Sequence, residues 1–292
     1  MTVIENAAAS PVAGLAVRAD LAHLTPSPRK PVQFAQVGGD DTWPDAPRFQ
    51  PQHVTVYDGR PIANGLSLDR EGFVLRRFES KVRDFEDDRQ VRRHFYPEVE
   101  RLIKAETGAA KVVIFDHTRR KDTGAADREG GQRVPVRRVH NDYTARSGPQ
   151  RVDDLLPPGE AALWKQGRFA VINVWRSIEG TVEAAPLAVA DASSMAAGDF
   201  VATDLVYPDR KGEIYYVTAN PQHRWYYFPK MREDEAILLK CYDSQENGVA
   251  RFTAHTAFDD GLAAPGAAAR HSIEIRALVL LDDPRRHYGF MI

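Results

Sequence analysis

Short runs of β-branched and aromatic residues recur along this chain of 292 residues, each bounded by Gly, Pro or Asp. Such runs are typical of strands. Helical periodicity is confined to two regions, and strands do not alternate regularly with helices. This pattern favours an antiparallel barrel or sandwich over a parallel sheet. The predicted strands cover residues 53–57, 72–78, 111–116, 169–175, 213–218, 224–228, 235–242, 252–258 and 270–281.

The longer helical region spans residues 84–106, where apolar residues recur at helical spacing. We expect Pro97 to divide this region into two helices, because proline lacks an N–H and its ring clashes with the preceding turn. Gly108 is the expected C-terminal stop. A second, shorter helix is predicted over residues 159–166, after a Pro-Pro pair.

The first 30 residues are rich in Ala and Pro and contain no compact apolar run before a cleavage-like site. Glu5 and Asp20 also argue against an organelle transit peptide. We expect residues 1–30 to form a flexible N-terminal arm, or an arm that packs on a partner subunit. Residues 31–292 are expected to form a single, mainly β domain with flanking helices. The arm and the aromatic-rich strands are compatible with a homodimer.

Composition restricts the partners and the location of the protein. The net charge of −2 provides no general attraction to nucleic acid or to an anionic membrane. No apolar run reaches the roughly 18 residues that a membrane span needs. Cys241 is the only cysteine, which excludes an internal disulfide and a multi-cysteine metal site, and its apolar surroundings predict a core residue. These absences favour a cytoplasmic protein.

Residues 139–143 (VHNDY) place His140 and Asp142 two positions apart. On an extended strand both side chains project from the same face. A surface turn is the simpler interpretation of an isolated His-x-Asp triplet. However, the extended residues before it and a Gly-Pro pair after it place the triplet near a strand end, where pocket residues commonly lie. A distant histidine would complete a two-histidine, one-carboxylate face, the ligand set of non-haem Fe(II) oxygenases.

His255 is the favoured third ligand. Its strand places it on one face with Thr253 and Ala257, small neighbours that leave room for a metal. His223 is the alternative, although it could equally belong to a turn. His117 ends a predicted strand and is a pocket candidate, but it precedes the triplet in the chain.

The last predicted strand alternates polar and apolar residues. Arg270, Ser272, Glu274 and Arg276 share one face, and the opposite face is apolar. A solvated face of an antiparallel sheet explains this pattern as well as a polar barrel interior does. In an interior, the Arg270 guanidinium would pair with a carboxylate and the Ser272 hydroxyl would add a donor. The position of this strand, one strand after His255, favours the functional interpretation.

Fe(II) with 2-oxoglutarate accounts for both features together. The 2-oxo acid chelates iron through its keto oxygen and C1 carboxylate, its distal carboxylate needs a buried cation, and O2 takes the remaining position. We therefore expect oxidation of a bound substrate coupled to decarboxylation of 2-oxoglutarate to succinate. The protein's own task is then binding and orientation.

Several segments, taken in this order, resemble a known family that we expect to cover most of the chain. It is the secondary-metabolite hydroxylase/desaturase family, which includes the cephamycin 7α-methoxylation component, the fungal asa-type hydroxylases and gibberellin desaturase-like proteins. The segments that carry the resemblance are 68–73 (LDREGF), 115–118 (FDHT), 139–144 (VHNDYT), 173–176 (NVWR), 223–227 (HRWYY), 234–235 (DE) with 242–244 (YDS), 255–258 (HTAF) and 270–276 (RHSIEIR).

This resemblance implies a double-stranded β-helix, the jelly-roll core that is also found in cupins. It implies Fe(II)/2-oxoglutarate-dependent hydroxylation, desaturation or related C–H oxidation of a small-molecule natural product. By motif matching, the iron ligands would be His140, Asp142 and His255. Arg270 and Ser272 would hold the distal carboxylate of 2-oxoglutarate.

Further candidates flank these residues. Asn173 and Arg176 are candidates for cofactor binding, but their parities differ, so at most one faces the pocket if the strand is regular. A structural role for Arg176, capping a carboxylate, is the alternative. The candidates for the substrate side of the pocket are Tyr143, His117 and Arg276.

Two other classes of function remain open on the sequence. A cupin-like metal-dependent isomerase or dioxygenase would use the same ligand face without 2-oxoglutarate, and Arg270 would then hold a substrate carboxylate. A non-catalytic β-sandwich binding protein would contain the histidines as structural residues only.

Overall fold

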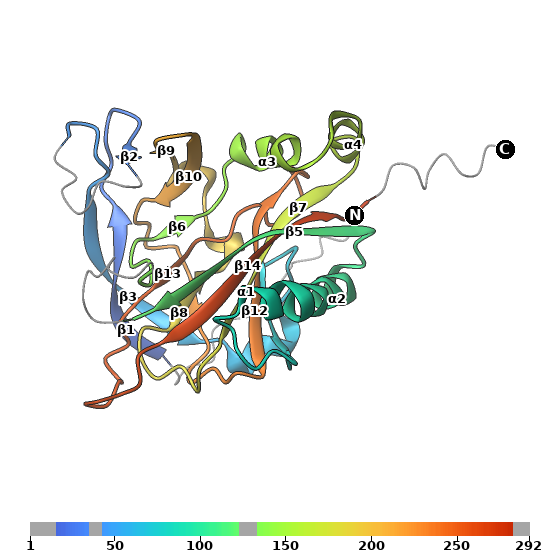
Figure 1. The fold of residues 1–292 in the computed structure, drawn as a ribbon. Helices are drawn as coiled ribbons and strands as arrows, with labels where there is room; N and C mark the ends of the chain where they lie inside the picture. Colours follow the sequence, from blue (N-terminus) through green and yellow to red (C-terminus); the bar gives the residue numbers. More distant parts are fainter. Residues whose placement is uncertain (1–15, 35–42, 123–132, 283–292) are drawn as a thin grey trace, which may run out of the picture.

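The computed structural model describes residues 16–34, 43–122 and 133–282, which form two curled, mainly antiparallel sheets (Figure 1). The nine-stranded sheet has the order β1 (Ala16–Leu24), β3 (Phe49–Asp58), β11 (Trp225–Tyr227), β8 (Leu187–Ala190), β13 (His255–Ala257), β6 (His140–Asn141), β10 (Lys211–Val217), β9 (Phe200–Val206) and β2 (Val32–Phe34). The five-stranded sheet has the order β4 (Phe73–Arg77), β12 (Glu235–Asp243), β7 (Phe169–Ser177), β14 (His271–Leu280) and β5 (Lys111–Lys121).

The nine-stranded sheet curls back on itself. Leu24 at the end of β1 forms a parallel bridge with Thr218, beside β10. The N–H of Val139, next to β6, donates to the carbonyl of Ala22 at 2.9 Å. The concave side of this curl encloses a small apolar cluster of its own, which includes Leu21, Val56, Ala190, Trp225 and Phe258.

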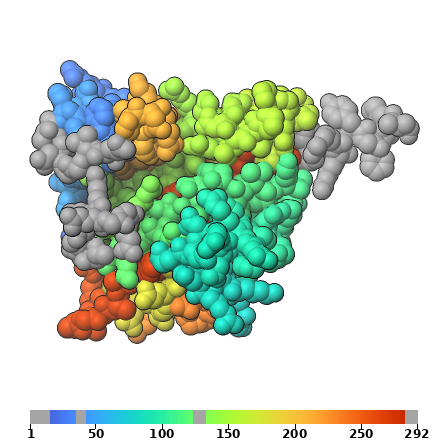
Figure 2. Space-filling model, in the orientation of Figure 1, coloured from blue at the N-terminus to red at the C-terminus, as the bar shows by residue number. Residues whose placement is uncertain are grey.

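The five-stranded sheet is deeply buried, since every residue of β7 and β12 is buried. Cys241 of β12 is among these buried residues, as expected. Helical turns α1 (Asp88–Gln90) and η2 (Val91–Phe95) and helix α2 (Tyr96–Thr107) cover the outer face of this sheet, and they form the teal surface in Figure 2. Among the described residues, no helix is long and apolar enough to cross a membrane.

Strand β14 lies between β7 and β5 and gives the five-stranded sheet two different faces. Arg276 is opposite Asn173 of β7 and Asp116 of β5, so these three side chains share one face. The alternate residues, such as Ile275, pack in the apolar core on the helical side. The polar face is directed at the nine-stranded sheet, which makes the space between the two sheets the polar interior of a jelly roll.

Each strand predicted from the sequence is present. The short strands β2 and β8 were missed because they span three and four residues, too few to show a periodicity. The two residues of β6 fall in the extended segment that was expected to carry His140. Strand β9 and helix α3 (Ser147–Leu155) were also missed, whereas α4 (Pro158–Trp164) matches the predicted second helix.

The expectation of a flexible arm over residues 1–30 is wrong for its second half. Residues 16–24 form β1, which pairs with β3 along its whole length. Ala19 and Leu21 are buried, whereas Arg18 and Asp20 are exposed, so the strand alternates like any half-buried strand. Its Ala content concealed this pattern, and the β domain therefore begins before residue 31. Residues 1–15 lie outside the described residues.

Pro97 does not divide the long helical region. It follows directly on the wider π turn η2, in which the Tyr96 N–H donates to the Val91 carbonyl, and this loosened turn accommodates a proline inside a helix. The π turn η2 runs directly into α2, and the chain remains helical through the junction. Gly108 ends the helix as predicted, with a left-handed φ of 67° and its N–H donating to the Lys104 carbonyl.

Candidate metal centre

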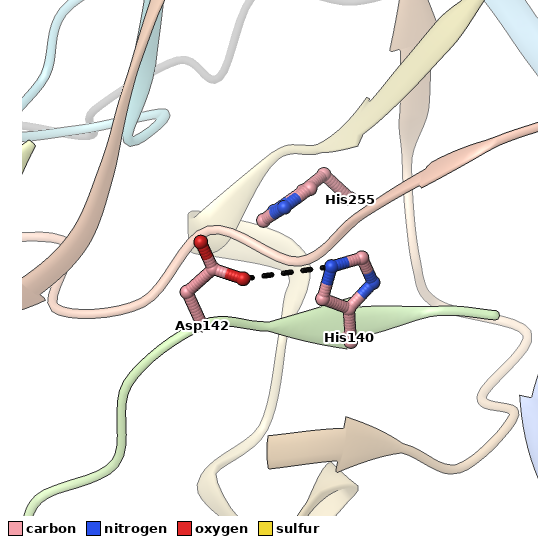
Figure 3. A group of neighbouring side chains, drawn as sticks. All are labelled: His140, Asp142 and His255. Atoms are coloured by element: carbon pink, nitrogen blue, oxygen red, sulfur yellow. Dashed lines mark ion pairs between the residues drawn. The ribbon is translucent and has the colours of Figure 1, made fainter. Parts of the chain in front are cut away.

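His140 and His255 lie on neighbouring antiparallel strands, β6 and β13, directly opposite each other in the register. Opposite side chains project to the same face, and the two ring centroids are 4.4 Å apart. Asp142 follows β6 and turns its carboxylate toward them (Figure 3), with Oδ1 at 3.6 Å from His140 Nε2. One ligand atom from each of the three residues lies within 4.8 Å of the others. We call these residues the His-Asp-His group.

Each imidazole is oriented by a backbone carbonyl two residues earlier in the chain. Nδ1 of His140 lies 2.7 Å from the Arg138 carbonyl, and Nδ1 of His255 lies 3.0 Å from the Thr253 carbonyl. A carbonyl only accepts, so each Nδ1 carries the hydrogen and each Nε2 presents its lone pair. Burial lowers the pKa of His140 to about 3, and His255 lowers it further. His140 is therefore neutral near pH 7, the state that binds a metal.

Asp142 is held from the five-stranded sheet. Its Oδ2 accepts from Asn173 Nδ2 at 2.8 Å and from Arg276 Nε at 3.0 Å. Burial by itself raises the pKa of Asp142. The charges of Arg276, His255 and His140 and the Asn173 hydrogen bond outweigh burial and hold this pKa well below its usual range. Asp142 is therefore an anion.

Asn141 lies between the two motif ligands and was not identified as functional from the sequence. Its side chain is fully buried and donates to the carbonyls of Tyr143 at 2.6 Å and Cys241 at 2.8 Å. Its Oδ1 accepts from the N–H of Thr253 at 3.2 Å, two residues before His255. One amide thus fixes both ligand-bearing segments relative to β12.

Arg270 is a buried guanidinium that lacks an anionic partner among the described residues. Its Nη1 donates to the Ala185 carbonyl at 2.6 Å, and its Cζ lies 5.3 Å from the Trp175 ring centroid. Its Nε is buried and makes no hydrogen bond. Burial lowers the pKa of Arg270 to about 9, and the charge of Arg120 adds to this effect. Such a group is stabilised by a bound carboxylate.

Ser272 and Arg120 accompany Arg270. Ser272 is buried and lies directly opposite Arg120 of β5, so both side chains face the interior. Arg120 is half-buried, and its Nη1 donates to the Val134 carbonyl at 2.9 Å. The sequence prediction ended this strand at residue 116 and therefore missed Arg120. Extending the alternation along β5 would have placed it on the same face as Asp116.

Arg176 faces the opposite way, which corrects its candidacy as a cofactor-binding residue. It is opposite in parity to Asn173, and only Asn173 reaches the His-Asp-His group. The Arg176 guanidinium lies 5.3 to 5.8 Å from the ring centroids of Phe78, Phe85 and Phe95, on the helical side of the sheet. It donates to backbone carbonyls rather than capping a carboxylate.

His117 is also turned away from the interior, contrary to its candidacy for the substrate side. It lies opposite Ile275, whose side chain points to the helical layer. Its Nδ1 is 2.8 Å from the Tyr96 hydroxyl and its Nε2 is 3.2 Å from Asp88.

His223, the alternative third ligand, lies in a different cluster. Its Nε2 is 2.9 Å from Asp199, and its ring stacks on His23 and contacts the edge of Trp225. The structure therefore brings His255, and not His223, to the His-x-Asp pair.

Tyr143 is buried next to Asp142, and its ring centroid lies 6.0 Å from the Arg151 guanidinium. Burial raises the pKa of the Tyr143 phenol. The positive charge of Arg276 opposes this rise, and the negative charge of Asp142 adds to it. Tyr143 thus remains a candidate for the pocket wall. Arg276, the other substrate candidate, is instead engaged by carboxylates, since it contacts Asp142, Asp116 and Glu274.

A two-histidine, one-carboxylate group lies between the sheets of a jelly roll, and Arg270 has no anionic partner among the described residues. Together these features are typical of the class of non-haem metal oxygenases.

Comparison with known proteins identifies the family within this class. Residues 22–280 match the family model described as "Oxidoreductase/YMDC permease-like domain". The chain is 33% identical over 265 residues to "Hydroxylase/desaturase efuI" of Hormonema carpetanum, covering 82% of this chain and 87% of that protein. It is 35% identical over 269 residues to "Alpha-ketoglutarate-dependent dioxygenase phiK" of a fungal species, covering 85% and 94%.

A solved structure agrees with these relatives. The "iron and alpha-ketoglutarate-dependent endoperoxidase NvfI" has a TM-score of 0.82 and 26% identity, covering 91% of this chain and 98% of that chain. The chain belongs to the family of Fe(II)/2-oxoglutarate-dependent hydroxylases and desaturases. The predicted family, enzyme class and jelly-roll fold are thereby confirmed.

Proposed function

We propose that this protein is an Fe(II)/2-oxoglutarate-dependent dioxygenase in which His140, Asp142 and His255 hold the iron. Its substrate is a small-molecule natural product that undergoes hydroxylation, desaturation or a related C–H oxidation. The observation that carries the proposal is the convergence of the three ligand atoms within 4.8 Å.

The donor set fits iron. Two imidazole nitrogens and one carboxylate oxygen bind from one side, which leaves the opposite face of the ion open. Both Nδ1–H groups are already used by backbone carbonyls, so only the Nε2 atoms are available. This second layer of hydrogen bonds fixes the rings for metal binding. Iron bound here supplies O2 activation coupled to decarboxylation of 2-oxoglutarate.

The co-substrate end also fits. Arg270 is buried, carries a positive charge and has an Nε without a hydrogen-bond partner. We assign Arg270 and Ser272 to the distal carboxylate of 2-oxoglutarate, because an anion there would satisfy the guanidinium. Trp175 packs against Arg270 and helps to hold it in place. We place Tyr143 in the wall of the substrate pocket.

The residues of this site therefore bind and orient the metal and the 2-oxo acid. The carbonyls of Arg138 and Thr253 hold the imidazole tautomers, the five-stranded sheet holds Asp142, and Arg270 sets the direction of the 2-oxo acid. A shift of any of these groups would leave the substrate in an unreactive position. Orientation contributes strongly to the reaction rate.

Anaerobic titration tests this function. Adding Fe(II) and 2-oxoglutarate to the protein is expected to give a weak visible charge-transfer band, which His140→Ala abolishes and Arg270→Ala weakens. Admitting O2 is expected to release succinate. A protein that binds Fe(II) but gives no band and no succinate would belong with the metal isomerases or dioxygenases that do not use 2-oxoglutarate.

A further inference from the structure

The interior face of the five-stranded sheet carries three rows of polar side chains across β5, β14 and β7. Residues in one row are direct partners in the register and share a face. The row nearest Asp142 contains Asp116, Arg276 and Asn173. The next two rows are Thr118, Glu274 and Trp175, and Arg120, Ser272 and Ser177.

Two donors from the first row meet one oxygen of Asp142. Asn173 Nδ2 at 2.8 Å and Arg276 Nε at 3.0 Å both donate to Oδ2. A carboxylate oxygen offers two lone pairs, so these donors occupy Oδ2 fully. Oδ1 is the oxygen that faces His140 Nε2, at 3.6 Å.

Glu274 keeps both donors in this arrangement. Its Oε1 accepts from Asn173 at 2.9 Å, and its Oε2 accepts from Arg276 Nη2 at 2.9 Å. The remaining Arg276 nitrogen, Nη1, donates to Asp116 at 3.1 Å and Thr118 at 3.0 Å. Rotation of either donor away from Asp142 would therefore break more than one hydrogen bond at once.

We infer that Asn173 and Arg276 are positioning residues that restrict Asp142 to one-oxygen coordination, through Oδ1 alone. This inference rests on the proposed function, because it assigns Asp142 to the metal. A carboxylate that bound through both oxygens would occupy an additional position on the ion. That position is needed by the two chelating oxygens of a 2-oxo acid together with O2. The device thus keeps one face of the ion open for the co-substrate.

The test measures metal and 2-oxo acid binding separately, without turnover. Asn173→Leu and Arg276→Gln are titrated anaerobically with Fe(II), and with Co(II) as a spectroscopic substitute. The metal-saturated proteins are then titrated with 2-oxoglutarate and with pyruvate, a 2-oxo acid that lacks the distal carboxylate. Arg176→Gln is the matched control, because it lies near Asn173 on β7 but faces the helices.

We expect each positioning variant to weaken metal binding by about 10- to 100-fold, the usual effect of losing an outer hydrogen bond to a metal ligand. On the metal-saturated protein, the affinities for 2-oxoglutarate and for pyruvate should fall by the same factor, because both substitutions act at the metal and not at the distal carboxylate. Arg270→Gln should weaken 2-oxoglutarate alone. If the two residues had a purely structural role, the variants would have a lower melting temperature, but their affinities for metal and for the 2-oxo acids would equal those of the wild type.

Arg276→Gln leaves Glu274 without its cation, so the variant could fail to fold. The double variant Arg276→Gln/Glu274→Gln leaves the net charge of the cluster unchanged, and the same metal and 2-oxo acid affinities are measured on it. If the folded variants keep the wild-type affinities for metal and 2-oxo acids, and the wild-type protein shows the charge-transfer band, the inference is overturned and the proposed function stands. Absence of the band in the wild-type protein would instead overturn the proposed function.

Discussion

His140 and His255 lie directly opposite each other on adjacent antiparallel strands, with their ring centroids 4.4 Å apart. A single register pair therefore places both imidazoles on the interior face, although they are distant in the chain. Each strand segment also supplies the carbonyl that accepts from Nδ1 of its own histidine. The juxtaposition of the two imidazoles is thus built into the strand pairing.

The first prediction concerns the choice of third ligand. His255→Ala is expected to weaken Co(II) binding by at least about 100-fold, because one of three protein ligands is lost. His223→Gln is the matched control, since His223 is equally buried but pairs with Asp199. Isothermal titration measures both variants. If His223→Gln weakens Co(II) binding and His255→Ala does not, His223 and not His255 is the third ligand.

The second prediction concerns the distal carboxylate. Arg270→Gln is expected to raise the dissociation constant for 2-oxoglutarate by about 10- to 100-fold, because a charged hydrogen bond contributes roughly 1.5 to 3 kcal/mol. Fe(II) affinity should remain that of the wild type, since Arg270 does not contact the His-Asp-His group. The intensity of the charge-transfer band during titration is the measurement. An equal loss of affinity for pyruvate, which lacks the distal carboxylate, would contradict the assignment of Arg270.

The third prediction concerns Arg176. Arg176→Gln is expected to lower the free energy of unfolding by about 1 to 3 kcal/mol, because the guanidinium packs on three phenylalanine rings and donates to two carbonyls. Affinity for 2-oxoglutarate should not change. Chemical denaturation and the co-substrate titration measure the two quantities. A selective loss of co-substrate affinity would restore Arg176 to the site.

The fourth prediction concerns acid stability. Burial lowers the pKa of His23 from 6.5 to about 4, with the Leu21 carbonyl opposing this effect and His223 adding to it. The unfolded chain then binds more protons than the folded protein between these pH values. The free energy of unfolding should therefore be independent of this group above pH 6.5 and decrease as the pH falls toward 4, by at most about 3 kcal/mol.

Comparison with His23→Gln isolates this contribution from other titrating groups, His140 included. The difference between the two denaturation curves should grow in favour of the wild type as the pH rises from 4 to 6.5. A difference that is constant over this range would show that His23 titrates normally in the folded protein.

Much of the fold could be predicted because β-branched runs and alternation are local properties. The ends of β7, β12 and β14 follow from such runs within one or two residues. The two residues of β6 carry no such signal, and β1 contains more alanines and charged residues than larger apolar residues. These strands exist because their neighbours in the sheet provide hydrogen-bond partners.

By itself, the sequence determined that His140 and Asp142 share a face and that Arg270, Ser272 and Arg276 share another, since both statements need only the two-residue repeat of a strand. Only the tertiary structure decided which faces meet. It placed His255, and not His223, beside His140 and Asp142, turned Asn173 inward and Arg176 outward, and engaged Arg276 with Asp142. The physical reason is that register and sheet packing depend on contacts between distant segments, which no local repeat contains.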